Sequence, residues 1–171
     1  TYALEHRFQP PATSDQSNAV LVALQTHSGV ASVTVDGRPA TKVGQSELVQ
    51  LWAAQQVPVG GREVVVTLTQ STVVGAITSS YDGVARLPEG ESWSGTAVTN
   101  NLLMNVRTES QGAFVVGFAT ANYSSSWLRA GTNTVKHAET GSGSSSGFGF
   151  FSSTLNPIAS PGRHALNVTM P

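Results

Sequence analysis

The sequence predicts an all-β protein, a single domain built as a two-sheet antiparallel β-sandwich. Two observations support this prediction. About ten short strand-like runs are separated by a turn signal every ten or so residues, which is typical of sandwiches and barrels. Within residues 31–84, the run 32–35 alternates apolar and polar side chains, and Asp36-Gly37 follows at once. Alternation indicates a half-buried strand, and Asp-Gly between two such runs indicates a hairpin with a type I′ turn.

The first third of the chain supplies three predicted elements. Residues 2–8 are expected to form a first strand, or, with the turn-rich loop that ends at residue 18, an extended N-terminal arm. Residues 19–26 are an apolar run of strand length. After the Asp36-Gly37 turn, the return strand is expected at residues 40–43.

The middle of the chain contains one ambiguous segment between two strong strands. Residues 47–56 are good helix formers, but sequential strands usually neighbour each other, so their position favours a strand. Residues 63–68 contain three consecutive valines and are expected to form a strand covered on both faces. Residues 73–80 form the next predicted strand, and Tyr81-Asp82-Gly83 is expected to turn the chain.

The last third continues the same pattern. The expected strands are residues 102–108, 113–121, 134–139, 148–155 and 165–170. The Gly/Ser-rich run at 141–147 has the composition of a flexible segment and is expected to be a mobile loop. No internal repeat and no domain break interrupts residues 1–171, so one domain is expected.

Composition excludes several classes of function. The 171 residues carry a net charge of −1, only 11% charged residues and no cysteine. The absence of a basic stripe argues against nucleic acid as a partner, and no apolar run is long enough to span a membrane. Without cysteine there is no disulfide, thiolate zinc site or thiol catalysis. The chain starts at Thr1, which is expected to follow either a removed leader or a trimmed initiator Met.

The pieces between residues 31 and 84 resemble the β-sandwich modules of bacterial secreted proteins and phage structural proteins. The shared pattern is VTVDG at 33–37 with TKV at 41–43, VQLW at 49–52, PVG at 58–60 with VVV at 64–66, and a strand that ends in YDGV at 81–84. The resemblance implies a jelly-roll or immunoglobulin-like sandwich and a role in display, adhesion or assembly. It supplies no catalytic residues.

Residues with catalytic or metal-binding chemistry are scattered. Glu89 and Glu91 flank Gly90 and are the one candidate acid/base pair, for a glycan-cleaving enzyme. His137 and Glu139 are two apart, so on a strand they are expected to face the same way. No zinc-binding spacing occurs. We therefore expect no catalytic residues, no metal site and no cofactor.

Three aromatic residues in polar loops are the candidate binding residues. Trp93, Tyr123 and Trp127 lie in Ser-rich or Gly-flanked stretches. An exposed aromatic ring can stack on a sugar or anchor a protein interface, and the alternative is that each ring caps an open end of the sandwich. Trp52 lies in a strand-like run and is expected in the core.

These observations predict a non-catalytic structural or display module. It is expected on the outside of a phage particle, as a decoration or fibre protein, or on a bacterial surface, as an extracellular protein that acts by protein–protein contacts. The expected partners are further copies of the chain or other structural proteins of the particle. The alternative is a carbohydrate-binding module in which Trp93, Tyr123 and Trp127 stack on glycans.

Overall fold

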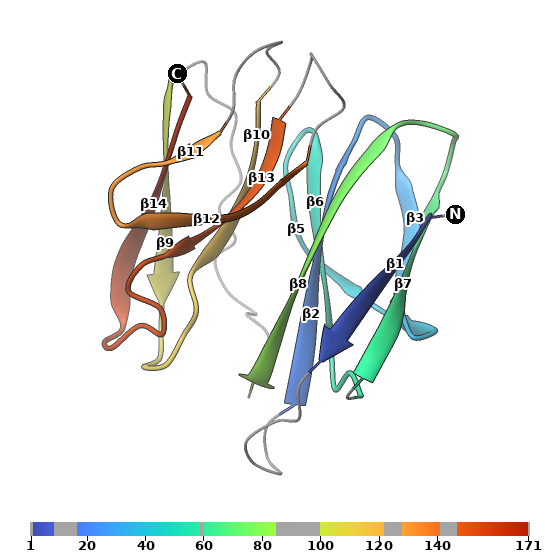
Figure 1. Ribbon diagram of the computed structural model, residues 1–171, viewed down its shortest axis with the longest axis horizontal. Coiled ribbons are helices and arrows are strands. Elements are labelled where there is room, and N and C mark those ends of the chain that lie inside the picture. The colour runs from blue at the N-terminus through green and yellow to red at the C-terminus, as the bar shows by residue number, and fades with distance from the viewer. Residues whose placement is uncertain are drawn as a thin grey trace. The chain divides into compact units, whose positions relative to one another are not determined.

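The computed structural model describes residues 2–8, 17–58, 60–84, 100–121, 128–140 and 147–170. All regular structure in these ranges is antiparallel β-strand, which confirms the predicted all-β class (Figure 1). The chain divides into two compact units, Thr1–Gly90 and Glu91–Pro171. The single sandwich domain over residues 1–171 stays a prediction. None of the described residues belongs to a helix that could cross a membrane.

The first unit contains two four-stranded sheets. One sheet has the order β1 (Tyr2–Phe8), β7 (Gly60–Leu68), β3 (Val30–Val35) and β4 (Arg38–Pro39). The other has the order β5 (Thr41–Gln45), β6 (Val49–Gln55), β2 (Ser17–Thr26) and β8 (Val74–Val84). The ambiguous segment at 47–56 is therefore a strand, as its position between strands predicted.

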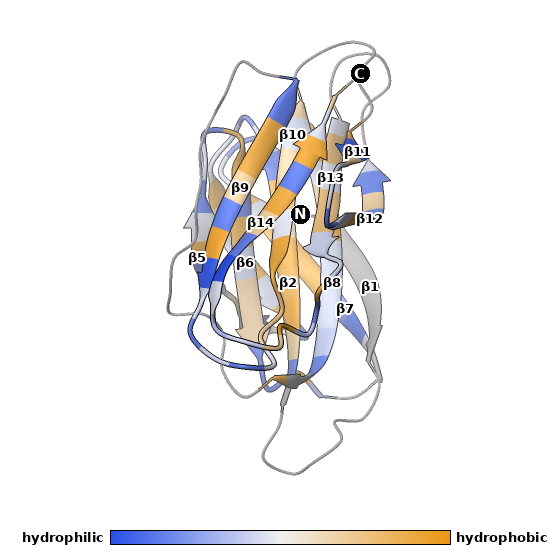
Figure 2. Ribbon diagram, turned by 90° about the vertical axis from the view of Figure 1, so that its left-hand side faces the viewer, coloured by the Kyte–Doolittle hydropathy of each residue, from blue (hydrophilic) through white to orange (hydrophobic). Residues whose placement is uncertain are grey.

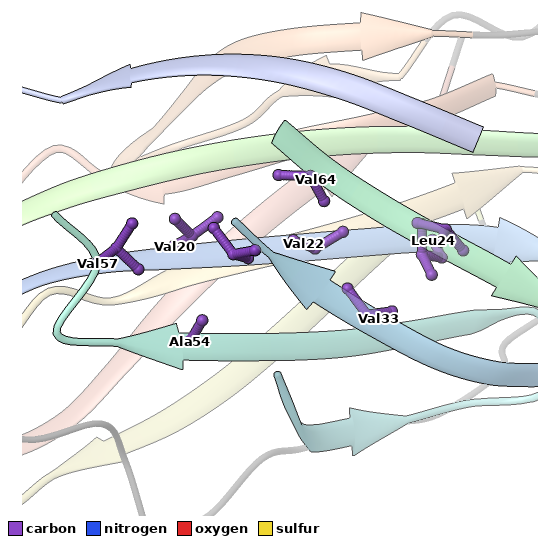
Figure 3. Packing of buried hydrophobic residues seen from close by; sticks show 9 residues of the cluster. Val20, Val22, Leu24, Val33, Ala54, Val57 and Val64 are labelled. Atoms are coloured by element: carbon purple, nitrogen blue, oxygen red, sulfur yellow. The ribbon is translucent and has the colours of Figure 1, made fainter. Parts of the chain in front are cut away.

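Both sheets of the first unit contribute to one buried cluster (Figure 3). The side chains come from alternate positions of their strands, as the period of two requires. A fully buried valine or leucine contributes roughly 1.5–3 kcal/mol, so this cluster is a main source of stability for the unit. Its members are Val20, Val22, Leu24, Val33, Val35, Ala54, Val57, Val64 and Val66.

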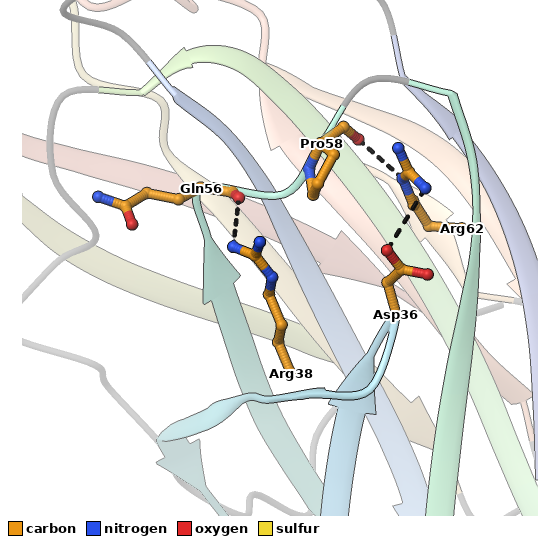
Figure 4. Close-up of polar contacts among 5 residues, drawn as sticks. All are labelled: Asp36, Arg38, Gln56, Pro58 and Arg62. Carbon is orange, nitrogen blue, oxygen red and sulfur yellow. Dashed lines mark hydrogen bonds and ion pairs between the residues drawn. The ribbon is translucent and has the colours of Figure 1, made fainter.

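The Asp36-Gly37 turn has the predicted conformation. The φ angles are 52° at Asp36 and 75° at Gly37, as a type I′ turn requires. The side chain of Asp36 forms an ion pair with Arg62, with 3.4 Å between Oδ2 and Nη1 (Figure 4). Arg62 Nε in turn donates to the Pro58 carbonyl at 3.1 Å. Arg38 Nη1 donates to the carbonyl of Gln56 at 3.2 Å. These bonds attach the hairpin to the connection between β6 and β7.

Three predicted features of the first unit are wrong. The return strand of the hairpin is only β4, because residues 41–45 leave it and pair with β6 as β5. The valine strand is not covered on both faces, since Glu63 and Thr67 on one face are exposed whereas Val64 and Val66 on the other are buried. Tyr81-Asp82-Gly83 lies inside β8, where the two residues at 82 and 83 oppose the single residue Asn18 in β2. The turn signal thus marks a β-bulge.

The second unit contains two three-stranded sheets. One has the order β10 (Val116–Ala121), β13 (Gly147–Ser153) and β12 (Thr134–Thr140). The other has the order β11 (Arg129–Ala130), β14 (Gly162–Thr169) and β9 (Asn101–Thr108). In Figure 2, β9 and β14 run side by side with alternating hydrophobic and hydrophilic bands. Residues 113–115, predicted as strand, precede β10 without belonging to a strand.

The hydrophobic face of β9 and β14 packs into a second buried cluster. This cluster also takes side chains from β10 and β13 and from the connections that flank them. Both sheets of the second unit therefore share one core, as the two sheets of the first unit do. Its members are Met104, Val115, Ala119, Ala121, Leu128, Phe151, Ile158, Leu166 and Val168.

Candidate binding site at the edge of β14

One edge of β14 is paired along its whole length, and the other is paired only in part. Beyond the end of the β9–β14 ladder, Met170 N donates to Asn100 O at 2.9 Å. Hydrogen-bonding direction alternates along an antiparallel strand, so the even-numbered residues of β14 direct their N–H and C=O groups toward β9. The odd-numbered residues Arg163, Ala165 and Asn167 therefore direct theirs toward the opposite edge.

At that opposite edge, the described residues cover only the C-terminal end of β14. The Asn167 carbonyl accepts a hydrogen bond from Gly131 N at 2.7 Å, and Asn167 N donates to Thr134 Oγ1 at 2.8 Å. β11 itself pairs only with the last two residues of β14. Within the part of the chain that the structure describes, no strand pairs with this edge at Arg163 or Ala165.

A tight turn explains why β11 ends where it does. Asn133 has a φ of 58°, a left-handed conformation that Asn tolerates better than most residues. The turn is closed by Thr134, whose N donates to Gly131 O at 3.3 Å and whose Oγ1 donates to Thr132 O at 3.3 Å. A Cβ at Gly131 would lie 2.7 Å from Asn167 Cγ, so glycine permits this close approach. The chain then leaves β14 and enters β12.

A cavity of about 330 Å³ lies at the uncovered edge. Its walls come from β9, from β14, from the turn between β11 and β12, and from the turn that follows β13. The size is at the lower end of the range of small-ligand pockets. The lining residues are Leu103, Thr132, Asn133, Ser153, Leu155, Arg163, His164, Ala165 and Asn167.

Two exposed leucines line this cavity. Leu103 in β9 is 52% exposed, and Leu155 in the turn after β13 is 60% exposed. That turn is held by Leu155 N, which donates to Ser153 Oγ at 3.1 Å, and by Thr154 N, which donates to Asn133 O at 3.1 Å. Apolar surface is therefore presented to solvent from two separate elements that line the same cavity.

The electrostatics of the cavity are simple. Arg163 is exposed and, among the described residues that line the cavity, is the only Lys, Arg, Asp or Glu. His164 Nε2 and Asn167 Oδ1 are buried and have no hydrogen-bond partner within the described residues. The cavity can thus recognise a ligand by backbone hydrogen bonds, by apolar contact and by attraction of negative charge.

The structure does not place the residues that the sequence singled out for glycan or protein binding. Trp93, Tyr123 and Trp127 lie outside the described residues. The same holds for Glu89 and Glu91, the candidate acid/base pair. Their predicted roles stay predictions.

His137 and Glu139 lie on opposite faces of their sheet. A one-residue bulge in β12 falls at His137, whose Nε2 lies 2.6 Å from Ser152 Oγ and whose ring centroid lies 5.0 Å from that of Phe150. Glu139 pairs with Lys136 on the other face, with 2.7 Å between Oε2 and Nζ. The prediction that His137 and Glu139 face the same way is wrong because the extra residue breaks the alternation.

Trp52 and His27 both belong to the first unit. Trp52 packs against the core cluster of the first unit, which confirms its predicted place, and Lys42 Nζ lies 6.0 Å from its ring centroid. His27 is exposed at the end of β2. In the described part of the chain, no three His, Cys, Asp or Glu side chains come together as a metal-binding group.

The sequence did not single out Arg163, Ala165 or Asn167. The residues Gly131-Thr132-Asn133 have the composition of a turn and could have indicated where β11 ends, but they do not say which strand is left uncovered. No protein-family model, curated protein or solved structure matches this chain.

Proposed function

We propose that this protein is a non-catalytic structural or display module that acts by protein–protein contacts. The observation that carries the proposal is the uncovered edge of β14, flanked by the exposed side chains of Leu103 and Leu155. An unpaired strand edge is a template for pairing with another chain, and apolar side chains beside it favour such contacts. The low content of charged residues, 11%, favours an extracellular or particle-surface location, on a phage or a bacterial cell.

We further propose that the two sheets of each unit form a sandwich. In the first unit, the arrangement is immunoglobulin-like at its centre, because β2 pairs with β6 and β3 pairs with β7, as strands B and E and strands C and F do in that fold. The outer strands differ, since β1 pairs with β7 and β8 pairs with β2. A jelly-roll order is the alternative topology.

Light scattering behind a sizing column tests the proposed function. A module that assembles through its own surface is expected to elute with the native mass of a defined, closed oligomer. A wild-type monomer at every accessible concentration contradicts assembly by self-contact.

The cavity favours a second candidate function, a carbohydrate-binding module. Its lining includes hydroxyl, amide and guanidinium groups, which are suited to a ligand rich in hydroxyls. In this alternative, Trp93, Tyr123 and Trp127 would stack on the sugar rings. Glycan-array retention that is lost on changing each aromatic residue to Ala would support it, and unchanged or absent retention would reject it.

A further inference from the structure

We propose that the uncovered edge of β14 binds a short extended peptide segment of a partner protein as an added strand, with a carboxylate of that peptide at Arg163. This inference rests on the proposed function, which it makes specific by naming the site and the kind of partner. The added strand would lie where β11 would lie if it extended past Gly131. It would continue the sheet β11-β14-β9 by main-chain hydrogen bonds.

The backbone of β14 supplies the main-chain partners. Ala165 directs both its N–H and its C=O away from β9, and no described strand receives them. The N–H and C=O groups of Arg163, two residues earlier, also point away from β9. Since bonding positions recur every second residue, the edge offers two ladder positions, which a peptide of about three extended residues spans.

The side chains around the edge supply selectivity. Leu103 and Leu155, both more than half exposed, would contact an apolar side chain of the bound peptide. Successive side chains of an extended peptide alternate between two faces, so an apolar residue at one position leaves its neighbours free to point away from the leucines. In the expected recognition sequence, apolar residues therefore alternate with residues of another kind.

The charge at the site favours an acidic peptide over a neutral or basic one. Arg163 is the only Lys, Arg, Asp or Glu that lines the cavity, it is exposed, and it forms no ion pair within the described residues. A guanidinium binds a carboxylate through two parallel hydrogen bonds. We therefore place a Glu or Asp side chain, or a C-terminal carboxylate, next to Arg163.

Amide hydrogen exchange tests the premise on the free protein. The amide of Ala165 is expected to exchange rapidly with D₂O, whereas those of His164 and Leu166, which pair with β9, are expected to be protected. Binding of a peptide strand is expected to protect the Ala165 amide. An Ala165 amide already protected in the free protein would overturn the proposal.

Binding is measured with an array of capped pentapeptides in which apolar residues alternate with Glu, Lys or Thr. Saturable binding is expected for the Glu-containing peptides, followed by titration of the best one in solution against the full chain. Ala165→Pro removes the N–H that faces the cavity while leaving the bonds to β9 intact, and is expected to weaken binding at least about tenfold. Ala165→Ser keeps the N–H and is the matched control.

Two further measurements keep the test independent of whether Ala165→Pro folds. N-methylation of the peptide at alternate positions removes its donors without changing the protein, and one of the two alternating sets is expected to abolish binding. Arg163→Glu is expected to reverse the preference from Glu-containing to Lys-containing peptides. Binding that none of these changes affects, or no saturable binding on the array, overturns the proposal.

The test of the peptide site and the test of the proposed function can fail independently of each other. A closed oligomer that binds no peptide contradicts only the peptide site, and a monomer that binds peptide contradicts only assembly by self-contact. If Ala165→Pro instead converts a wild-type oligomer into monomers, the edge is occupied by a second copy of the chain, and the proposal of a separate partner peptide is wrong.

Discussion

The side-chain amide of Asn156 pairs with the backbone of Val115 as a neighbouring strand would. Val115 N donates to Asn156 Oδ1 at 2.9 Å, and Asn156 Nδ2 donates to Val115 O at 2.9 Å. Ser153 N donates to the same carbonyl at 3.1 Å. Val115 is buried in the core of the second unit, so these bonds satisfy backbone groups that water does not reach.

Replacing Asn156 with Ala is expected to destabilise the protein by about 1–3 kcal/mol, because the buried N–H of Val115 loses its acceptor. The midpoint and slope of a urea denaturation curve measure this loss. Asn156→Asp keeps an oxygen for that N–H but sets a second, anionic oxygen against the Val115 carbonyl. It is therefore expected to be destabilised at neutral pH and to recover relative to Asn156→Ala at acidic pH, where the protonated carboxyl group can donate to that carbonyl. Equal stability of Asn156→Ala and the wild type would show that the pairing contributes nothing.

The type I′ turn gives a second prediction. Gly37→Ala is expected to lower the free energy of unfolding by about 1–2 kcal/mol, because a Cβ opposes the left-handed conformation at a φ of 75°. Space is not the cause, since a Cβ at Gly37 would meet nothing within 4 Å. Asn tolerates this conformation, so Gly37→Asn is the matched control and is expected to recover part of the loss. Thermal or urea unfolding of the three proteins measures the difference.

The elements determined by local chemistry were predictable from the sequence. The Asp36-Gly37 turn needs positive φ at two adjacent residues, and that pair adopts it readily, so the turn and its type follow from two letters. Alternation likewise predicted the buried face of β3, where Val33 and Val35 are buried. The strand at 47–56 was predicted from its neighbours, against a slight helix propensity.

Features that depend on the register between distant strands were not predictable. Asp82-Gly83 looks like a turn, but pairing of β8 with both ends of β2 carries the strand through it and makes it a bulge. The bulge at His137 depends on the register between β12 and β13. The candidate site has the same origin. No described strand receives the N–H and C=O groups of Ala165 because β11 stops short of this residue along β14, and no local pattern encodes where β11 stops.

The carboxylate of Glu139 supports a third prediction. Its Oε1 accepts from Leu128 N at 3.2 Å and its Oε2 from Lys136 Nζ at 2.7 Å, while Lys136 Nζ also donates to Leu128 O at 2.9 Å. Glu139→Ala removes the acceptor of a backbone N–H at a buried residue, and is expected to cost about 1–3 kcal/mol. Glu139→Gln keeps an oxygen for Leu128 and is expected to cost less. A Glu139→Gln variant that is less stable than Glu139→Ala in urea denaturation would contradict this assignment.

The last prediction concerns alkaline pH and Tyr81. Burial raises the pKa of Tyr81 above its usual value of 10.0, and the hydrogen bond with Ser79 opposes this in part. The folded protein thus retains a phenolic proton that the unfolded chain releases near pH 10. This contribution to stability is complete below about pH 10 and declines as the pH rises further, because there the unfolded state binds fewer protons than the folded state.

Ultraviolet titration of tyrosinate in the native protein measures this shift. The sequence contains three tyrosines, so Tyr81→Phe identifies the contribution of Tyr81 as the difference between two titrations. That difference is expected to titrate above pH 10 in the wild type, and Ser79→Ala is expected to move it higher, since the opposing hydrogen bond is lost. Urea unfolding across the same pH range is expected to show a weaker alkaline loss of stability in Tyr81→Phe than in the wild type. A Tyr81 component that titrates at or below pH 10 contradicts the burial of its hydroxyl.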